Sequence, residues 1–202
     1  MIYSLKNVLV KFSIACFLLI PCKMAFSADF YDAEIIIFSQ LKKQGDKENL
    51  HQINPHHIDL QIKLNNLINK KRIIELEPAV DSHFPEILDK LRRSKNYEIL
   101  FHGQWSQTSV KRTKAPYVLI DLPRIDQEST LNGAIFLFAT DLLYLDLLLR
   151  YQPKSDNNMK FPAERPYYFI NHRRRIKFKE IHFIDHPKFG VIVSVRPVTL
   201  RD

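Results

Sequence analysis

Glycine is scarce in this sequence of 202 residues, which contains only four. Nucleotide-binding folds use glycine-rich loops that let the backbone approach a phosphate, and neither G-x-G-x-x-G nor G-x-x-x-x-G-K-[ST] occurs. We therefore expect no nucleotide cofactor, and no motif for another cofactor is present.

Cysteine and long apolar runs are also scarce. The only two cysteines, Cys16 and Cys22, lie near the amino terminus, together with the apolar segment from Phe12 to Ile20. That segment is too short to cross a bilayer, which takes about 20 apolar residues. Lysines precede it and the small-residue site Ala25-Phe26-Ser27 follows it. This pattern is typical of a signal peptide over residues 1–27, cleaved after Ser27.

Two other fates of this leader compete with cleavage. Cys22 is placed as in a lipobox, although Pro21 stands where a small residue is normally required, and an uncleaved leader would remain as an anchor. Removal of residues 1–27 would leave no thiol, which excludes disulfides, zinc-thiolate sites and cysteine nucleophiles. We expect a periplasmic protein with no stable membrane span after cleavage.

Acidic residues are outnumbered by basic ones, 22 to 30, which gives a formal charge of +8. Three of the lysines lie in the leader, so the exported chain would carry +5. A basic chain usually suggests nucleic acid, but export favours polyanions of the cell envelope instead. Stem-peptide carboxylates, lipid headgroups and an acidic protein face are the alternatives, and we expect no nucleic-acid partner.

The hydrophobic pattern predicts one α+β domain over residues 28–202, with one main helix packed on a largely antiparallel, multi-stranded sheet in the order β-α-β and then a β-meander. The helix has apolar positions at Phe84, Ile87, Leu88 and Leu91, with Asp81 or Ser82 as its cap. Residues 39–78 are expected to form a long irregular or partly helical connection. The predicted strands are 31–38, 97–105, 117–121, 131–139, 142–150, 167–178, 180–184 and 189–198. The segment from Leu142 to Tyr151 is ambiguous between strand and buried helix, and its neighbours favour strand.

Three consecutive arginines, Arg173, Arg174 and Arg175, form the strongest charge feature. On a strand, Arg173 and Arg175 would lie on one face and Arg174 on the other. One interpretation is an edge strand that charge protects from aggregation. The other is an anion-binding strip, because guanidinium groups bind carboxylates through two hydrogen bonds.

Aromatic and amide side chains near basic residues suggest a sugar-binding surface. Trp105 is the only tryptophan, and Gln107 follows it closely, while Tyr167 and Tyr168 precede the arginines. An aromatic ring can stack on a pyranose, and a glutamine can hydrogen-bond its hydroxyl and amide groups. The alternative for Trp105 is a core anchor.

The segment HFIDHPKFG at 182–190 contains two histidines four residues apart. On a strand, His182 and His186 would be about 13 Å apart, which is too far for one metal ion, so we expect no metal site. We expect a hairpin loop, in which Asp185 accepts backbone hydrogen bonds beside His186, Pro187 fixes φ and Gly190 takes a left-handed conformation. This loop would keep Val191, Val193 and Val195 in the core.

Motifs of catalysis are missing as well, since Gly-x-Ser-x-Gly, Ser-x-x-Lys and His-Glu-x-x-His do not occur. We expect no enzyme and assign no catalytic residue. Three segments taken together, YDAEIIIF at 31–38, LRRSKNYEILFHGQWSQ at 91–107 and RRRIKFKEIHFIDHPKFGVIVSV at 173–195, resemble the CsiV-like peptidoglycan-binding family of Gram-negative periplasmic proteins.

This resemblance implies a non-enzymatic protein that binds peptidoglycan and supports cell-wall synthesis and cell shape. It also implies two partners, a bifunctional peptidoglycan synthase and its outer-membrane lipoprotein activator. An alternative is an envelope adaptor that docks through the basic strip without binding the wall. The strand around Asp146 departs from the family, which tends to have a basic residue and a histidine there.

Overall fold

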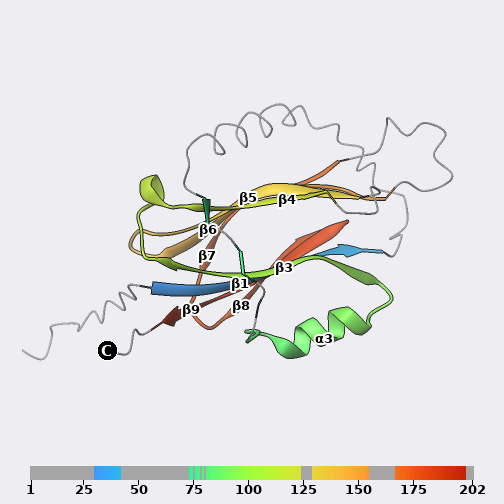
Figure 1. The fold of residues 1–202 in the computed structure, drawn as a ribbon, viewed down its shortest axis with the longest axis horizontal. Coiled ribbons are helices and arrows are strands. Elements are labelled where there is room, and N and C mark those ends of the chain that lie inside the picture. The colour runs from blue at the N-terminus through green and yellow to red at the C-terminus, as the bar shows by residue number, and fades with distance from the viewer. Residues whose placement is uncertain are drawn as a thin grey trace, which may run out of the picture.

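The computed structural model describes residues 30–41, 73–74, 76–77, 79, 81–123, 129–154 and 167–198. These residues are predominantly β, with one main helix. The helix and the antiparallel strands that the sequence predicted are confirmed. The single sheet is not, because the strands form two sheets that pack face to face (Figure 1).

The first sheet has four strands in the order β3-β1-β9-β8, and all its pairs are antiparallel. Its strands are β1 (Phe30–Gln40), β3 (Tyr97–Thr108), β8 (Ile181–His186) and β9 (Phe189–Val198). The second sheet has five strands in the order β2-β4-β5-β6-β7. These are β2 (Ile73–Ile74), β4 (Tyr117–Pro123), β5 (Thr130–Ala139), β6 (Leu143–Gln152) and β7 (Tyr168–Ile176).

The main core lies between the two sheets. On β9 the alternating residues Val191, Val193 and Val195 are fully buried, as predicted, and residues 33, 35 and 37 of β1 lie beside them. The second sheet contributes Leu145, Leu147 and Leu149 of β6 and further side chains of β4, β5 and β7. Alternation along each strand therefore directs one set of side chains inward and leaves the other set on an outer face.

The segment that was ambiguous between strand and helix is strand β6, which pairs with β5 on one side and β7 on the other. Its leucines at 143, 145, 147 and 149 face the core, while Tyr144, Asp146 and Arg150 lie on the outer face. The period of two, rather than the number of leucines, is what identifies the strand.

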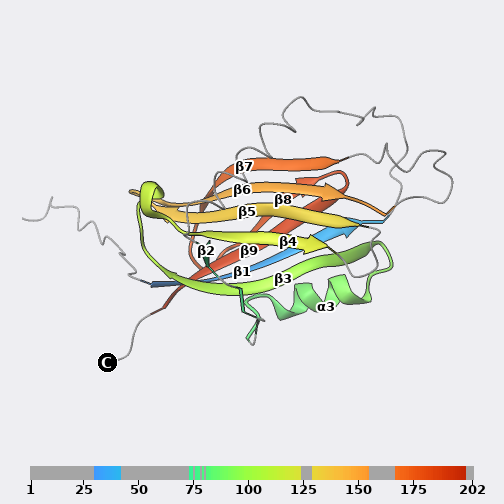
Figure 2. The same cartoon turned by 45° about the horizontal axis from the view of Figure 1, so that its top comes forward.

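The helix α3 (Pro85–Arg93) covers part of the outer face of the first sheet (Figure 2). Its Leu88 and Leu91 pack with Phe84 against Ile36, Phe38 and Ile192 in a second core. Phe84 is the N-cap and Pro85 follows it, so the expected cap at Asp81 or Ser82 was wrong. The hydroxyl of Ser82 accepts a hydrogen bond from the Phe84 amide, but it also serves another partner, described below.

The predicted connection at 39–78 is interrupted by regular structure at both ends. Strand β1 continues to Gln40, and β2 pairs in parallel with β4, with Ile73 opposite Tyr117. The remainder of the connection lies largely outside the described residues, as do the leader at 1–27, its cleavage site and Cys22. The described helices, α3 and the 3-10 turn η1 (Arg112–Lys114), are both too short to span a bilayer.

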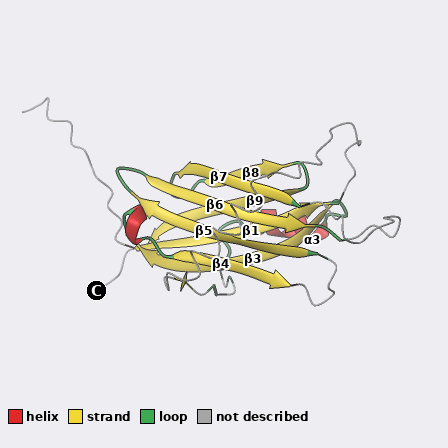
Figure 3. Cartoon of the chain, turned by 90° about the horizontal axis from the view of Figure 1, so that it is seen from above, coloured by secondary structure: helices red, strands yellow, loops and turns green. Residues whose placement is uncertain are grey.

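The chain passes between the sheets on opposite sides of the sandwich. The passage from β3 to β4 lies on one side and the passage from β7 to β8 on the other, and the chain also crosses from β1 to β2 and from β2 back to β3. Among the described strands, β7 ends the second sheet and β8 ends the first, and both edges lie on the same side of the molecule (Figure 3). This side of the sandwich is therefore open between two strand edges.

Candidate functional site

A groove of about 470 Å³ lies between the edges of β7 and β8. It is lined by residues 169–172 and Arg174 of β7 and by residues 183–186 of β8. We call it the β7–β8 groove. Edge strands carry backbone N–H and C=O groups that point away from the sheet, so both walls offer hydrogen-bonding groups to a ligand.

The side chains that face into the β7–β8 groove follow from the register of the two strands. Ile170 and Ile176 of β7 and Ile184 of β8 belong to the core between the sheets. Because side chains alternate, His172 and Arg174 lie on that same inward face of β7, and His186 does so on β8. The groove thus has an aliphatic floor and cationic or imidazole walls.

The predicted arginine strip is divided between two environments. Arg173 and Arg175 lie on the outer face of β7, as the alternation predicted, and Arg174 lies on the inward face. All three are exposed. The side chains of Arg174, Arg175 and His172 make no hydrogen bond or ion pair with any residue that the structure describes, whereas the side chain of Arg173 does.

Arg173 is neutralised by a carboxylate of the neighbouring strand. Its guanidinium donates to both Asp146 oxygens at 2.6 and 2.8 Å, and Arg112 contacts the same carboxylate at 3.2 Å. The hydrogen bond and the charge of Asp146 raise the pKa of Arg173 above its usual value. Arg112 and Arg173 also lie over the ring of Phe138. Asp146 therefore removes one arginine from the set available to an anion.

The predicted tyrosines lie at one end of the groove, and both have partners. Tyr168 is partly buried, with its ring 5.8 Å from that of His186 and with Lys188 Nζ at 6.0 Å. Tyr167 lies under the guanidinium of Arg150 at 5.1 Å. Both rings are thus engaged within the protein, although neither is fully enclosed.

Trp105 and Gln107 lie in the core rather than on a surface. Trp105 is 2% exposed and Gln107 is 5% exposed. The indole N–H donates to Gln107 Oε1 at 3.0 Å, and Gln107 Nε2 donates to the Leu137 carbonyl of the opposite sheet at 2.8 Å. This pair links the two sheets, so the burial supports the core-anchor interpretation and contradicts a sugar-stacking role for these two residues.

The hairpin between β8 and β9 is confirmed, but two of its residues act differently from the prediction. Asp185 pairs with Gly190 and His186 with Phe189, which leaves Pro187 and Lys188 as the turn. The loop amide of Lys188 donates to His186 Nδ1 at 3.2 Å, whereas Asp185 accepts from the Gln40 side chain. The turn acceptor is therefore His186, because the Asp185 side chain points to the outer face.

Gly190 does not have the left-handed conformation that was predicted, since none of the described glycines has a positive φ. Its requirement is space: a Cβ at this position would lie 2.6 Å from Cζ of Phe38. The described residue with a positive φ is Lys179, at 61°, in the turn between β7 and β8.

His182 is buried and serves that same turn. Its Nε2 accepts a hydrogen bond from the Lys177 amide at 3.1 Å. Because His186 Nδ1 is occupied by the Lys188 amide, each histidine has a structural partner of its own. The described residues contain no group of three or more His, Cys, Asp or Glu side chains arranged to hold a metal ion.

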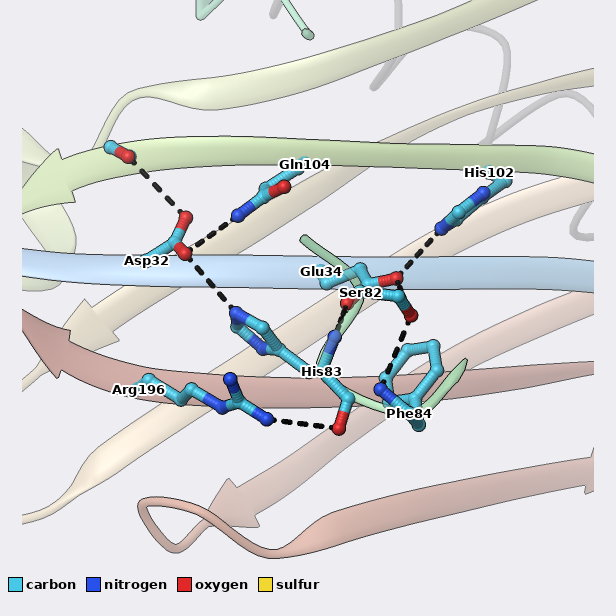
Figure 4. A network of polar contacts seen from close by, with 9 residues as sticks. Asp32, Glu34, Ser82, His83, Phe84, His102, Gln104 and Arg196 are labelled. Atoms are coloured by element: carbon cyan, nitrogen blue, oxygen red, sulfur yellow. Dashed lines mark hydrogen bonds and ion pairs between the residues drawn. The ribbon is translucent and has the colours of Figure 1, made fainter. Parts of the chain in front are cut away.

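A second polar cluster lies on the outer face of the first sheet, and the sequence interpretation missed it (Figure 4). Glu34 of β1 is fully buried. Its carboxylate accepts hydrogen bonds from the Ser82 hydroxyl and the His102 imidazole, both at 2.7 Å, and from the His83 amide. We call this cluster, with Asp32 and Gln104, the Glu34 network.

Asp32, two residues before Glu34, holds the same segment. Its carboxylate accepts from His83 Nε2 at 3.1 Å and from Gln104 Nε2 at 2.6 Å. Arg196 of β9 donates to the carbonyl of His83 at 3.0 Å. The contacts attach residues 82–84, which lead into α3, to β1 and β9, while β3 joins the network through the bonds of His102 and Gln104 to the two carboxylates.

The Glu34 network has the residue types of a catalytic site without its connections. A serine nucleophile needs a base that accepts its proton, commonly a histidine. Ser82 donates instead to Glu34, and each histidine donates to a carboxylate. Two acidic residues within the otherwise apolar strand YDAEIIIF are the available indication of a buried polar cluster, although alternation alone would place such residues on an exposed face.

Comparison with known proteins gives one result that covers nearly the whole sequence. The family described as peptidoglycan-binding protein, CsiV, matches residues 9–198. No curated protein and no solved structure matches the chain. Given the length of the family match, the chain belongs to the CsiV peptidoglycan-binding protein family.

Proposed function

We propose that the protein binds peptidoglycan through the β7–β8 groove. The observation that carries this proposal is the open edge of the sandwich, where Arg174 and His172 are exposed beside a groove and have no anionic partner among the described residues. Peptidoglycan is rich in carboxylates, and a guanidinium binds a carboxylate through two hydrogen bonds. The family membership supports the same ligand.

The binding is expected to be weak and dependent on salt. The cations are exposed, and an exposed ion pair contributes at most about 1 kcal/mol, which salt reduces further. The peptidoglycan meshwork presents the same ligand many times. Repeated binding of the protein to neighbouring ligands therefore compensates for the low affinity of one contact.

Co-sedimentation with purified sacculi tests the proposal. The chain from Ala28 onward should pellet with sacculi at moderate salt, above a bovine albumin control, and increasing salt should release it. Absence of pelleting above albumin would overturn the proposal. We also propose that the protein is not an enzyme. Release of soluble muropeptides from the sacculi by the native protein, but not by a boiled sample, would contradict this.

The proposal includes export to the periplasm, because peptidoglycan lies there. It is supported by the leader at residues 1–27, with its lysines and short apolar segment. The amino-terminal sequence of the protein from a periplasmic extract should begin at Ala28. A chain that keeps Met1, or one that begins with an acylated Cys22, would indicate an anchored protein.

A second candidate function is that of an envelope adaptor in cell-wall synthesis and cell shape. Two apolar side chains of the edge strand β8, Ile181 and Phe183, are 48% and 47% exposed, and Phe183 lines the groove together with Arg174. Such a surface fits a protein partner with an acidic rim, and the family resemblance suggests the synthase and its lipoprotein activator as partners.

The outer-face arginines separate the two functions. If the adaptor function is correct, the double substitution Arg173→Ser and Arg175→Ser should abolish pull-down of the synthase or its activator while binding to sacculi persists. If pull-down of both partners persists together with sacculus binding, the adaptor function is contradicted and wall binding through the groove stands.

A further inference from the structure

We infer that the β7–β8 groove recognises a carboxylate of the peptidoglycan stem peptide rather than the glycan strand, with Arg174 as the group that binds it. This inference rests on the proposed function and identifies which part of the polymer the groove binds. Three observations carry it: the state of Arg174, the side chains that face the groove, and the dimensions of its walls.

Arg174 differs from its neighbour Arg173 in whether a carboxylate of the protein neutralises its charge. The guanidinium of Arg173 is held by Asp146 through two short hydrogen bonds. Arg174, on the other face of the same strand, has no ion pair with a described residue. Asp185 is the acidic residue among those that line the groove. The alternation of side chains along β8 places it on the outer face, where it accepts a hydrogen bond from the Gln40 side chain. An incoming carboxylate would therefore meet a cation that no described residue has neutralised.

Two aromatic residues line the groove, but strand alternation directs both rings toward the outer faces. Phe183 is 47% exposed and stacks on Phe38, with ring centroids 6.0 Å apart, and Phe169 packs against the outer-face cluster of the second sheet. Pyranose rings bind to exposed aromatic faces, whereas the inward side chains of the groove are Ile170, His172, Arg174, Ile184 and His186. The ring of His186 lies between those of Tyr168 and Phe189, at 5.8 and 5.2 Å. Trp105 is enclosed in the core. These side chains suit a charged group and short aliphatic groups, such as the alanyl methyls and carboxylates of a stem peptide.

The walls suit a short extended chain. From Ile170 to Arg174 the edge of β7 runs about 13 Å at 3.3 Å per residue, which is about the length of four residues of extended peptide. Each wall is the outermost described strand of its sheet, and the outward backbone groups of such an edge can bind the amides of a peptide. The glycan strand carries its amides as N-acetyl groups beside the sugar rings and not in its backbone, so it cannot extend the hydrogen-bonding pattern of a strand edge.

An inward charge on an edge strand has another explanation, namely protection against edge-to-edge aggregation. That explanation predicts that replacing Arg174 with a neutral residue would promote self-association of the protein and leave ligand binding unchanged. The inference predicts the opposite pattern, so the same variant distinguishes the two.

The test compares intact sacculi with sacculi from which an amidase has removed the stem peptides. We expect the wild-type chain to bind the denuded glycan at least about tenfold more weakly than intact sacculi. Arg174→Gln should bind intact sacculi about fivefold more weakly than the wild type, corresponding to roughly 1 kcal/mol, the upper value for an exposed ion pair. The matched control Arg175→Gln removes an equal charge from the outer face and should change binding less than about twofold.

A soluble competitor identifies the group that is recognised. A free stem tetrapeptide should displace the protein from sacculi, and the same peptide with its carboxylates converted to amides should not. If the groove instead binds an acidic protein segment, the free tetrapeptide should fail to compete with sacculi. This outcome overturns the inference.

The other outcomes separate this inference from the proposed function. Equal binding to intact and denuded sacculi, with Arg174→Gln as tight as wild type, overturns stem-peptide recognition while peptidoglycan binding stands. No binding to either preparation overturns the proposed function itself. Because Arg174 is exposed, its replacement should leave the thermal midpoint unchanged, and a monomeric elution volume confirms that self-association does not cause the loss.

Discussion

The Glu34 network and the β7–β8 groove have similar residue types but opposite states. Both combine histidines and a carboxylate with strands of the same sandwich. In the network, Glu34 is fully buried and accepts three hydrogen bonds from within the chain. In the groove, Arg174 and His172 are exposed, and no described residue pairs with them.

This difference teaches how to separate polar groups that stabilise the fold from those available to a ligand. A buried charge costs several kcal/mol unless its neighbours satisfy it, so an enclosed and fully bonded carboxylate is part of the structure. An exposed cation without a partner carries no such constraint and can bind an anion from outside. The residue types alone would have favoured the network as the functional site.

The largest effect is expected from Glu34→Ala. This change leaves the Ser82 hydroxyl, the His83 amide and the His102 imidazole without their acceptor in a buried place. We expect the free energy of unfolding to fall by roughly 3 to 5 kcal/mol. Urea unfolding followed by fluorescence measures the loss, while the folded fraction should still bind sacculi.

Asp32→Ala is the matched control for that experiment. The Asp32 side chain is 22% exposed, so in the variant water can replace part of the hydrogen bonds that are lost. We expect the free energy of unfolding to fall by about 1 to 2 kcal/mol. If Glu34→Ala instead abolished sacculus binding at unchanged stability, the comparison between the two regions would be broken. The network would then belong to the binding site.

The next effect concerns Gly190, in the hairpin that joins the two regions. A side chain at this position would clash with Phe38, which is buried against α3 and adjoins Tyr97 and Phe183. We expect Gly190→Val to lower the free energy of unfolding by roughly 1 to 3 kcal/mol, as overpacking does. Urea unfolding midpoints measure it.

A second substitution tests the cause of that loss. If space is what Gly190 provides, the cost of Gly190→Val should be smaller in a Phe38→Leu background than in the wild type. An equal cost in both backgrounds would point back to the backbone conformation that the sequence suggested and would contradict the steric explanation.

Alternation along strands was the part of the structure that the sequence could predict. The bounds of β9, Phe189–Val198, and its buried valines agree with the prediction, and so does the division of the three arginines between two faces. These features depend on the period of two within a single strand. They need no knowledge of what lies opposite.

Partners from distant segments were beyond the reach of the sequence. The side of β1 that carries Glu34 looked solvent-exposed because residues 82–84, which cover it, are 48 to 50 positions away. Asp146 meets Arg173 only because β6 and β7 are neighbours in register. Likewise, Gln107 turned inward because the opposite sheet supplies the Leu137 carbonyl. In each case tertiary contact, not local pattern, decided the role.

The smallest effect concerns His186, which belongs to both sides of the comparison because it faces the groove and also holds the turn. His186→Ala removes the acceptor of the Lys188 amide and two ring contacts. We expect a loss of about 1 kcal/mol in the free energy of unfolding and less than a twofold change in sacculus binding. A larger loss of binding at an unchanged thermal midpoint would make His186 a ligand-binding residue.

The pH dependence of this variant sharpens the assignment. Burial lowers the pKa of His186 below its usual value of about 6.5, and Lys188 adds to the shift while Asp185 opposes it. Between the two pKa values the unfolded chain binds more protons than the folded one, so the free energy of unfolding falls as the pH falls from about 6.5 to the folded pKa. One proton limits the slope to about 1.4 kcal/mol per pH unit. Urea unfolding at pH 7.5, 6.5 and 5.5 should therefore show the advantage of the wild type over His186→Ala shrinking as the pH falls. An advantage that grows toward pH 5.5 would mean that the fold stabilises the imidazolium, and His186 would then join Arg174 as a cationic wall of the groove.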